Sequence, residues 1–133
     1  MRIVIDTNVL VSGIFWSGNP HKILKLWVEE KFHLLVSNVI LKEYARVINE
    51  LSQEQNQPTL GDKWITFITQ NALVIEAPKV FHECRDPDDN KFIDCAIAGQ
   101  ASFLISGDKD LLDIKIVSGI SIISSKNFLK GNF

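Results

Sequence analysis

The chain has 133 residues, of which 46% are hydrophobic and 23% are charged, and its formal net charge is -2. This composition is typical of a folded protein and excludes a disordered tail, while the length favours a single domain spanning residues 1–133. The weak negative charge is unlike that of strongly basic nucleic-acid-binding domains, although carboxylates gathered around a metal ion would hide basic surface from a whole-chain count.

The cysteines and the hydrophobic segments both favour a cytoplasmic protein. Cys84 and Cys95 have no partner at the spacing of a zinc site, so we expect free thiols. No hydrophobic run reaches the roughly 18 to 20 residues needed to cross a bilayer. The first run is interrupted at Asp6, unlike a signal peptide. We therefore expect no membrane association.

The first predicted element is a buried strand that ends in a carboxylate. Residues 3–5 (Ile-Val-Ile) form a continuous hydrophobic run, which is typical of a parallel strand covered on both faces. Asp6 follows directly, at the edge where open parallel sheets carry their binding sites. Thr7 and Asn8 come next, as small polar residues able to hydrogen-bond a turn or a ligand.

Strands and helices are then predicted to alternate along the chain. The expected elements are a loop around Gly13 and 16–20, a helix at 21–31, a strand at 32–36, a helix from Ser37 or Asn38 to Leu51, a polar connection at 52–60, a short helix at 62–68 and a strand at 73–75. This order favours βαβ units on a parallel sheet.

The second half of the chain repeats the pattern of a strand that ends in an acid. The acidic segment 85–91 (RDPDDNK) predicts the start of a helix that continues to Ala101. A strand at 102–106 then runs into Gly107 and Asp108, so Asp108 repeats the position of Asp6. A helical turn at 109–113, a last strand at 114–117 or 120–123 and a docked tail near Phe128 complete the prediction.

Four carboxylates are expected to converge on one crevice. Asp6 and Asp108 end strands, Glu43 lies at the margin of the buried face of its helix, and Asp94 lies on an otherwise nearly apolar helix face. Four close anions repel one another unless a cation is present. Carboxylate oxygens suit Mg²⁺ or Mn²⁺, which activate water and stabilise charge on a phosphoryl group. Phosphodiester cleavage is the chemistry that this set fits best.

Each acid also has a structural explanation when it is considered alone. Asp6 and Asp108 could be turn or capping residues, and Glu43 could pair with Arg46 on the helix surface. Asp86, Asp88 and Asp89 are typical of helix-capping charges. Asp94 has the weakest structural explanation, because burying an unpaired carboxylate is costly. His21, His33 and His82 are scattered, without partners at a spacing that would suggest a site.

At these residues the chain resembles the PIN domain, and more narrowly the VapC-like ribonucleases that are the toxins of toxin–antitoxin pairs. The matching segments are 6–10 (DTNVL), Ser37 followed by Glu43, 85–96 (RDPDDNKFIDCA) and 106–112 (SGDKDLL). The resemblance implies a three-layer α/β/α sandwich around a mostly parallel sheet. It also implies Mg²⁺- or Mn²⁺-dependent cleavage of RNA and an antitoxin protein that covers or disrupts the site. Homodimers are common among such toxins.

The acids of the family, carried over by position, fall on four residues of this chain: Asp6, Glu43, Asp94 and Asp108. Asn8 matches the polar residue beside the first acid, and Ser106 matches the small hydroxyl residue before the last. For the substrate, basic side chains are expected to meet the flanking phosphates, namely Arg85, Lys91 and Lys109. Asp89 and Asp110 remain alternates for the site.

Three other functions are weighed against the ribonuclease. A Mg²⁺-dependent phospho-acceptor regulatory domain needs an acceptor Asp at the end of a central strand, where this chain has Ser37. A haloacid-dehalogenase-type phosphatase needs an acid two places after the nucleophile, where this chain has Asn8. A non-catalytic relative that binds RNA or protein would not need the complete set of acids.

Overall fold

The structure is a computed structural model and describes residues 1–132. Its elements in chain order are β1 (Arg2–Ile5), α1 (Thr7–Phe15), α2 (Asn19–Val28), β2 (His33–Val36), α3 (Asn38–Glu54), α4 (Pro58–Asn71), β3 (Leu73–Val74), the 3₁₀ turn η1 (Pro87–Asp89), α5 (Asn90–Ala98), β4 (Phe103–Ile105), α6 (Lys109–Leu112), β5 (Ile116–Val117), β6 (Ile120–Ile123) and α7 (Ser125–Asn132).

One six-stranded sheet, in the order β3-β2-β1-β4-β6-β5, organises the molecule. All neighbouring strands are parallel except β5, which pairs antiparallel with β6. β1 and β4 lie side by side at the centre, with Ile5 opposite Ile105. The residues after these two strands are Asp6 and Ser106, so the polar ends of β1 and β4 are adjacent.

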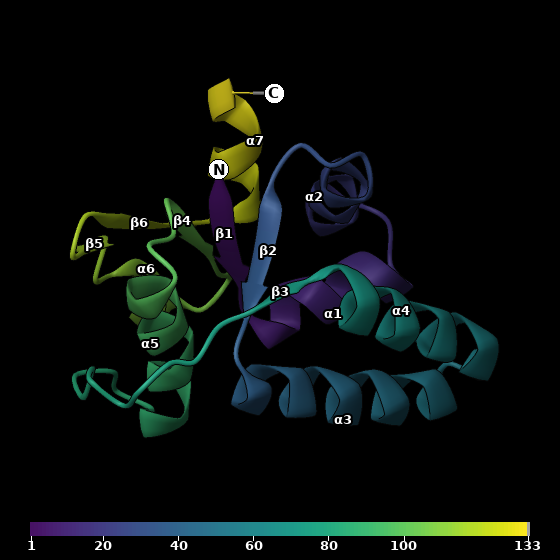
Figure 1. Cartoon of the computed structure of the whole chain (residues 1–133). Helices are drawn as coiled ribbons and strands as arrows, with labels where there is room; N and C mark the ends of the chain where they lie inside the picture. Colours follow the sequence, from purple (N-terminus) through teal and green to yellow (C-terminus); the bar gives the residue numbers. More distant parts are fainter. Residues whose placement is uncertain (133) are drawn as a thin grey trace.

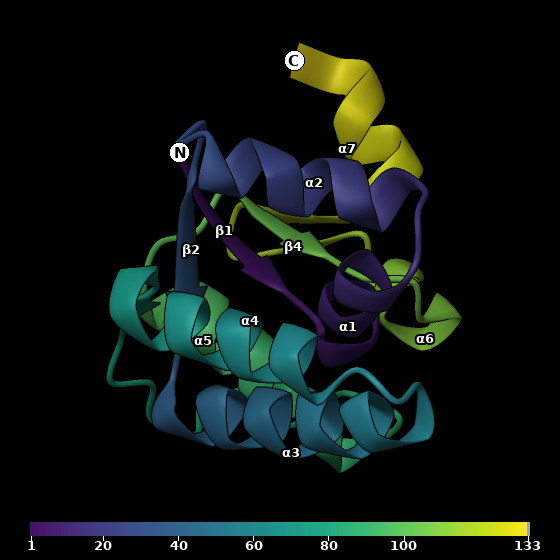
Figure 2. The same ribbon diagram turned by 90° about the vertical axis from the view of Figure 1, so that its right-hand side faces the viewer.

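Helices flank the sheet on both sides, which confirms the predicted α/β fold. α5 lies on one side of β1 and β2, and α2 lies on the other (Figure 1). α3 and α4 run side by side at the end toward which the arrows of β1 and β2 point, as the turned view also shows (Figure 2). This arrangement brings α3, α5 and the carboxyl ends of the central strands to one end of the sheet.

The core is built on the central strands, because their side chains are covered from both faces. Ile3, Val4 and Ile5 have no exposed surface, and the same holds for the last three residues of β2 and the last two of β4. From α3, Tyr44 is 1% exposed and its hydroxyl donates a hydrogen bond to the carbonyl oxygen of Ile5. This bond ties α3 to the last residue of β1, one residue before Asp6.

The segment after β1 is a helix, which the sequence pattern did not predict. Asp6 caps α1, and the helix continues through Gly13, where a loop was expected. A Cβ atom at Gly13 would lie 2.7 Å from the carbonyl oxygen of Pro20, so the missing side chain lets α1 and α2 approach closely. Gly13 therefore serves a close helix contact, while the expected loop is confined to residues 16–18, between α1 and α2.

Two other boundaries differ from the prediction. The polar segment expected at 52–60 is mostly helical, because α3 continues to Glu54 and α4 begins at Pro58, a residue suited to the first helical turn. Both candidates for the last strand form, as β5 and β6. Within residues 1–132, no helix combines the length and the hydrophobicity that a membrane crossing requires.

Candidate active site

Asp6 is the most deeply buried acid at the end of the central strands. Its side chain caps α1, with Oδ1 accepting a 2.8 Å hydrogen bond from the backbone N–H of Val9. Oδ2 accepts a hydrogen bond from the Ser106 hydroxyl. The residue is 5% exposed, and burial raises the pKa of Asp6, although the bonds from Ser106 and the backbone oppose that rise. Both oxygens are therefore held in fixed positions.

Ser106 connects the acids of the two central strands. Its Oγ donates to Asp6 and accepts a 3.0 Å hydrogen bond from the backbone N–H of Asp108. Asp108 in turn caps α6, where its Oδ1 accepts from the N–H of Asp110 at 2.9 Å. Because Ser106 is 1% exposed, this connection is shielded from water and its geometry is tightly determined.

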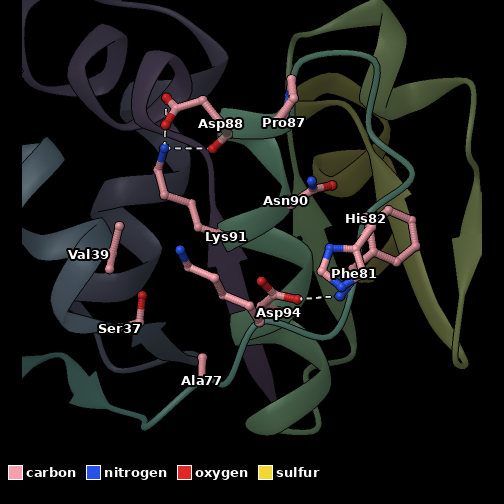
Figure 3. A pocket seen from close by; sticks show the side chains of 11 residues that line it. Ser37, Val39, Ala77, Phe81, His82, Pro87, Asp88, Asn90, Lys91 and Asp94 are labelled. Carbon is pink, nitrogen blue, oxygen red and sulfur yellow. Dashed lines mark hydrogen bonds and ion pairs between the residues drawn. The ribbon is translucent and has the colours of Figure 1, made fainter.

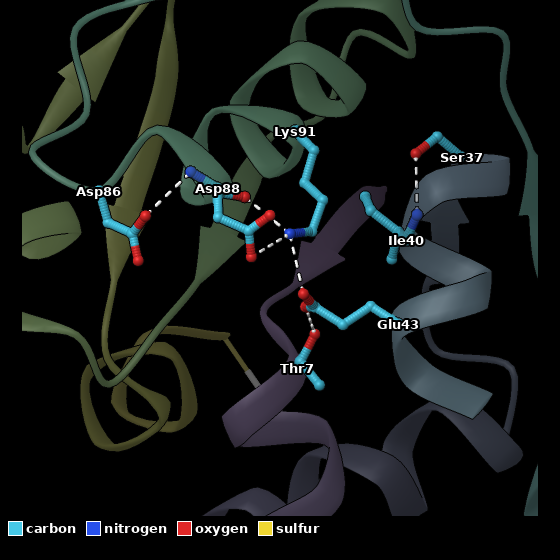
Figure 4. Close-up of polar contacts among 7 residues, drawn as sticks. All are labelled: Thr7, Ser37, Ile40, Glu43, Asp86, Asp88 and Lys91. Atoms are coloured by element: carbon cyan, nitrogen blue, oxygen red, sulfur yellow. Dashed lines mark hydrogen bonds and ion pairs between the residues drawn. The ribbon is translucent and has the colours of Figure 1, made fainter. Parts of the chain in front are cut away.

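Glu43 reaches the same end of the sheet from the first half of α3. Its Oε2 accepts a hydrogen bond from the Thr7 hydroxyl, and its Oε1 lies 2.9 Å from the Lys91 Nζ (Figure 4). Arg46, the surface partner considered for Glu43, pairs instead with Glu50 at 3.1 Å. Glu43 therefore points inward toward β1 and α5, as a site residue should.

Lys91 has two acidic partners. Its Nζ lies 2.9 Å from Oδ2 of Asp88 and 2.7 Å from the carbonyl oxygen of the same residue. Burial works to lower the pKa of Lys91, but the ion pairs with Glu43 and Asp88 outweigh burial and raise it. The ammonium group is thus firmly charged and neutralises part of the acidic cluster.

The acidic segment before α5 supplies the remaining carboxylates. Asp86 caps the turn η1, where its Oδ1 accepts a 3.0 Å hydrogen bond from the N–H of Asp88. Asp89 precedes α5 and faces Asp108. Burial, together with the neighbouring carboxylates of Asp108 and Asp86, raises the pKa of Asp89 to about 7. Such repulsion between Asp89 and Asp108 is what a bound cation relieves.

These acids line one cavity of about 230 Å³. The acidic residues in its wall are Asp6, Glu43, Asp86, Asp88, Asp89 and Asp108, and the other lining residues are Thr7, Asn8, Arg46, Val47 and Phe92. The structure thus brings together acids from the two strand ends and from α3. Asp89, an alternate in the sequence-based prediction, lies with them.

Asp94 does not join this cavity, so its predicted place in the acid cluster was wrong. It lies five residues beyond Asp89, which at about 100° per residue turns it to a different side of α5. Its Oδ1 accepts hydrogen bonds from the backbone N–H groups of Val80, at 3.0 Å, and Phe81, at 2.8 Å. These donors supply the structural explanation for a buried carboxylate that the sequence pattern lacked.

The basic residues predicted to meet phosphates are distributed unevenly. Arg85 is an exposed side chain, 3.5 Å from Asp110, and Lys109 is exposed at the start of α6; neither lines the acidic cavity. Of the three basic residues predicted to meet phosphates, Lys91 alone pairs with acids of the cavity, namely Glu43 and Asp88. Arg46, in contrast, lines the cavity and was missed as a site residue, although its place one helical turn after Glu43 could have indicated it.

The donor set fits a hard divalent cation, but the cluster is not already arranged as a metal site. Among residues 1–132, no three acidic, histidine or cysteine side chains are gathered closely enough to hold an ion. The acidic side chains in the cavity wall nevertheless offer carboxylate oxygens, the ligands that Mg²⁺ and Mn²⁺ prefer. Glu43 is neutralised by Lys91, so that the ion pair has to loosen before Glu43 can serve as a ligand.

Comparisons with known proteins give a consistent picture. The sequence model of the PIN domain family matches residues 2–110. An uncharacterized protein of Methanocaldococcus jannaschii is 36% identical over 118 residues, which span 86% of this chain and 76% of that protein. The crystal structure of VapBC2 from Rickettsia felis, bound to a DNA fragment from their promoter, has a similar fold, with a TM-score of 0.62 and 17% identity over 93% of this chain and 98% of that chain.

Proposed function

The chain belongs to the PIN domain family, and from this premise we propose that it is a metal-dependent endoribonuclease that hydrolyses RNA phosphodiester bonds at the acidic cavity. Residues 1–133 would form a single nuclease domain. The observation that carries the proposal is the convergence of acids from β1, α3, the start of α5 and the end of β4 on one cavity. PIN domain nucleases generally depend on divalent metal ions, which is consistent with this carboxylate-rich wall.

We assign the metal to Asp6, Glu43, Asp89 and Asp108, and we leave Asp94 out because its carboxylate lies outside the cavity. Bound Mg²⁺ or Mn²⁺ supplies positive charge for a phosphoryl oxygen and lowers the pKa of water, so that hydroxide becomes available at neutral pH. Burial and the neighbouring carboxylates of Asp108 and Asp86 raise the pKa of Asp89 to about 7, which supports this choice over a purely capping role.

The other residues of the cavity position the acids and the substrate. Ser106 fixes the carboxylate of Asp6, so this acid loses little freedom when it binds a ligand. Thr7 holds one oxygen of Glu43, and its other oxygen becomes available when the ion pair with Lys91 loosens. Arg46 offers a guanidinium group to a phosphate. Asn8 is exposed at the cavity and can donate a hydrogen bond to the RNA backbone.

We further propose that an antitoxin protein regulates this nuclease. Support comes from the resemblance of the motifs to VapC-like toxins and from the fold similarity to VapBC2. Induced expression of the intact chain is expected to stop the growth of a bacterial host, whereas the Asp6→Asn variant is expected to be harmless. Co-expression of the protein encoded by an adjacent small open reading frame should restore growth.

The direct test is incubation of the purified protein with a mixed pool of single-stranded RNA in Mn²⁺, Mg²⁺ or EDTA. We expect cleavage with either metal and none in EDTA, together with loss of cleavage in Asp6→Asn and in Asp89→Asn. Asp113→Asn is the matched control, because it removes an exposed acid that lines neither this cavity nor a neighbouring one, and it should still cleave. A folded protein that cuts no RNA with either metal would instead be a non-catalytic relative that binds RNA or protein.

A further inference from the structure

A second cavity, of about 360 Å³, adjoins the acidic one. Asp88 lines both cavities, and Lys91, which pairs with Glu43 of the acidic cavity, lines the second. The volume falls in the range of small-ligand pockets, about 300 to 1,000 Å³. A polymer such as RNA that placed a phosphate in the acidic cavity could therefore place the neighbouring nucleotide in the second cavity.

Asp94 carries an unused hydrogen-bond acceptor into the second cavity. The residue is 4% exposed, and its Oδ1 accepts both backbone hydrogen bonds, from Val80 and Phe81. Oδ2 accepts no hydrogen bond from residues 1–131. It nevertheless keeps contact with solvent, because among the described side chains the Ser52 hydroxyl alone is both inaccessible to solvent and without a hydrogen-bond partner. Figure 3 shows the Asp94 carboxylate in the cavity, between Ser37 and Val39 on one side and Phe81 and His82 on the other.

The remaining wall combines hydrophobic surface with polar and charged side chains, among them Asn90, Lys79 and Lys91. Asn90 accepts a 3.0 Å hydrogen bond from the N–H of Cys84 through Oδ1, which leaves its Nδ2 as a donor at the cavity. Phe81 and His82 provide aromatic rings, and Val39 and Pro87 provide aliphatic surface. A planar ligand with N–H donors on one edge and an acceptor beside them would match this wall.

We propose that the second cavity is a nucleobase subsite that selects guanine next to the bond that is cut. This inference rests on the ribonuclease activity proposed above. Guanine presents two neighbouring donors, N1–H and the 2-amino group, to the free oxygen of Asp94, and its O6 can accept from Asn90. Uracil presents carbonyl oxygens on both sides of its single N–H, and these are repelled by a carboxylate. Asp94 is thus a specificity-determining residue of the nuclease.

The experiment measures base preference with short oligouridylates that carry at the centre a guanosine, an inosine or a further uridine. Pairs of oligomers compete for the Mn²⁺-loaded intact chain, and the ratio of kcat/KM values is read from the products. In parallel, fluorescence anisotropy in EDTA gives the Kd for each oligomer. We expect guanosine to be preferred over uridine about tenfold, and inosine, which lacks the 2-amino group, to lose much of that preference.

Three variants distinguish recognition of the base in the second cavity from a general change in RNA binding or cleavage. Asp94→Asn keeps an oxygen for the N–H groups of Val80 and Phe81 but turns a donor toward the base, so the preference for guanosine should disappear. Val39→Trp fills the cavity from an exposed helix position, without altering Asp94, and should also abolish it. Glu83→Gln removes an exposed acid that lines neither cavity and should retain it.

The outcomes distinguish failure of the guanine subsite from failure of the proposed ribonuclease activity. Cleavage without base preference would contradict the guanine subsite but not the proposed nuclease activity, and so would a preference that survives both Asp94→Asn and Val39→Trp. A cationic side chain of a partner protein would then be the better ligand for the second cavity. Neither binding nor cleavage of any RNA by the folded chain would overturn the nuclease and the subsite together. If circular dichroism shows that Asp94→Asn is unfolded, Val39→Trp alone decides.

Discussion

The ammonium group of Lys91 lies 2.9 Å from the carboxylate of Glu43, among acids that would otherwise face one another without a cation. The side chains of Lys91 and Glu43 are only 12% and 16% exposed. Their ion pair is therefore screened less by solvent than an ordinary surface pair. In the metal-free protein, Lys91 acts as the counter-ion of the acidic cluster.

Lys91→Met should destabilise the metal-free protein, because it leaves Glu43 and Asp88 without their cation. We expect the free energy of unfolding to fall by about 1–3 kcal/mol, as measured by urea denaturation in EDTA. The affinity for Mn²⁺, measured by isothermal titration calorimetry, should rise, since the ion no longer competes with the ammonium. Lys109→Met, at an exposed position, is the control and should change neither quantity. Unchanged Mn²⁺ affinity in Lys91→Met would contradict the counter-ion role.

Ser106→Ala should weaken the connection between Asp6 and Asp108. The substitution removes the donor to Asp6 and the acceptor for the N–H of Asp108, both in a buried setting. A loss of about 1–3 kcal/mol in the free energy of unfolding is expected from the unsatisfied groups. Denaturation of Ser102→Ala, in which an exposed serine before β4 is changed, gives the reference. Equal stability of the two variants would show that the Ser106 bonds contribute little.

Asp89→Asn should change how the stability of the metal-free protein depends on pH. The pKa of Asp89 is about 7 in the folded chain, against 3.8 for an ordinary aspartate, so the folded state binds this proton more tightly. Stability from this group is therefore present below about pH 4 and is lost as pH rises toward 7. The variant cannot lose a proton, so in EDTA its Tm should exceed that of the parent at pH 8 more than at pH 5. Asp113→Asn, at an exposed site, should show no such difference.

The thiol of Cys84 should be slow to alkylate, although it is partly exposed. Burial, reinforced by the carboxylates of Asp89, Asp94, Asp108 and Asp86, raises the pKa of Cys84 to about 11. At pH 8 the thiolate is thus scarce, and reaction with iodoacetamide should be roughly 100-fold slower than for a free cysteine with a pKa of about 8.5. Mass spectrometry of Cys95→Ser isolates the signal of Cys84. Labelling at the rate of a free cysteine would show that the acids do not surround this thiol.

The sequence predicted well those features that depend on local pattern. Continuous hydrophobic runs identified β1, β2 and β4, and the position after a parallel strand identified Asp6 and Asp108 as neighbours before any contact was known. Helical periodicity placed Glu43 at the margin of a buried face, where it meets Thr7. These features require only the alternation of strands and helices.

Features that depend on distant backbone groups could not be predicted in this way. The carboxylate of Asp94 is satisfied by the N–H groups of Val80 and Phe81, in an irregular segment whose path no periodicity describes. The same limit applies to α1, since Gly13 indicates a loop unless the approach of Pro20 is known. A buried acid on an apolar helix therefore indicates a partner but does not say whether that partner is a metal ion or a loop.

The central pairing of β1 with β4 also sets the order in which the cavity is completed during protein synthesis. Asp6 and Ser106 are 100 residues apart, and Asp89 and Asp108 lie in the last third of the described chain. At about 5–20 residues per second, a ribosome needs roughly 5–20 seconds to pass from one to the other. Until β4 has emerged, β1 lacks its neighbour and no assembled cavity exists. A ribosome that makes this chain is therefore exposed to the finished site only after β4 has been synthesised and has paired with β1.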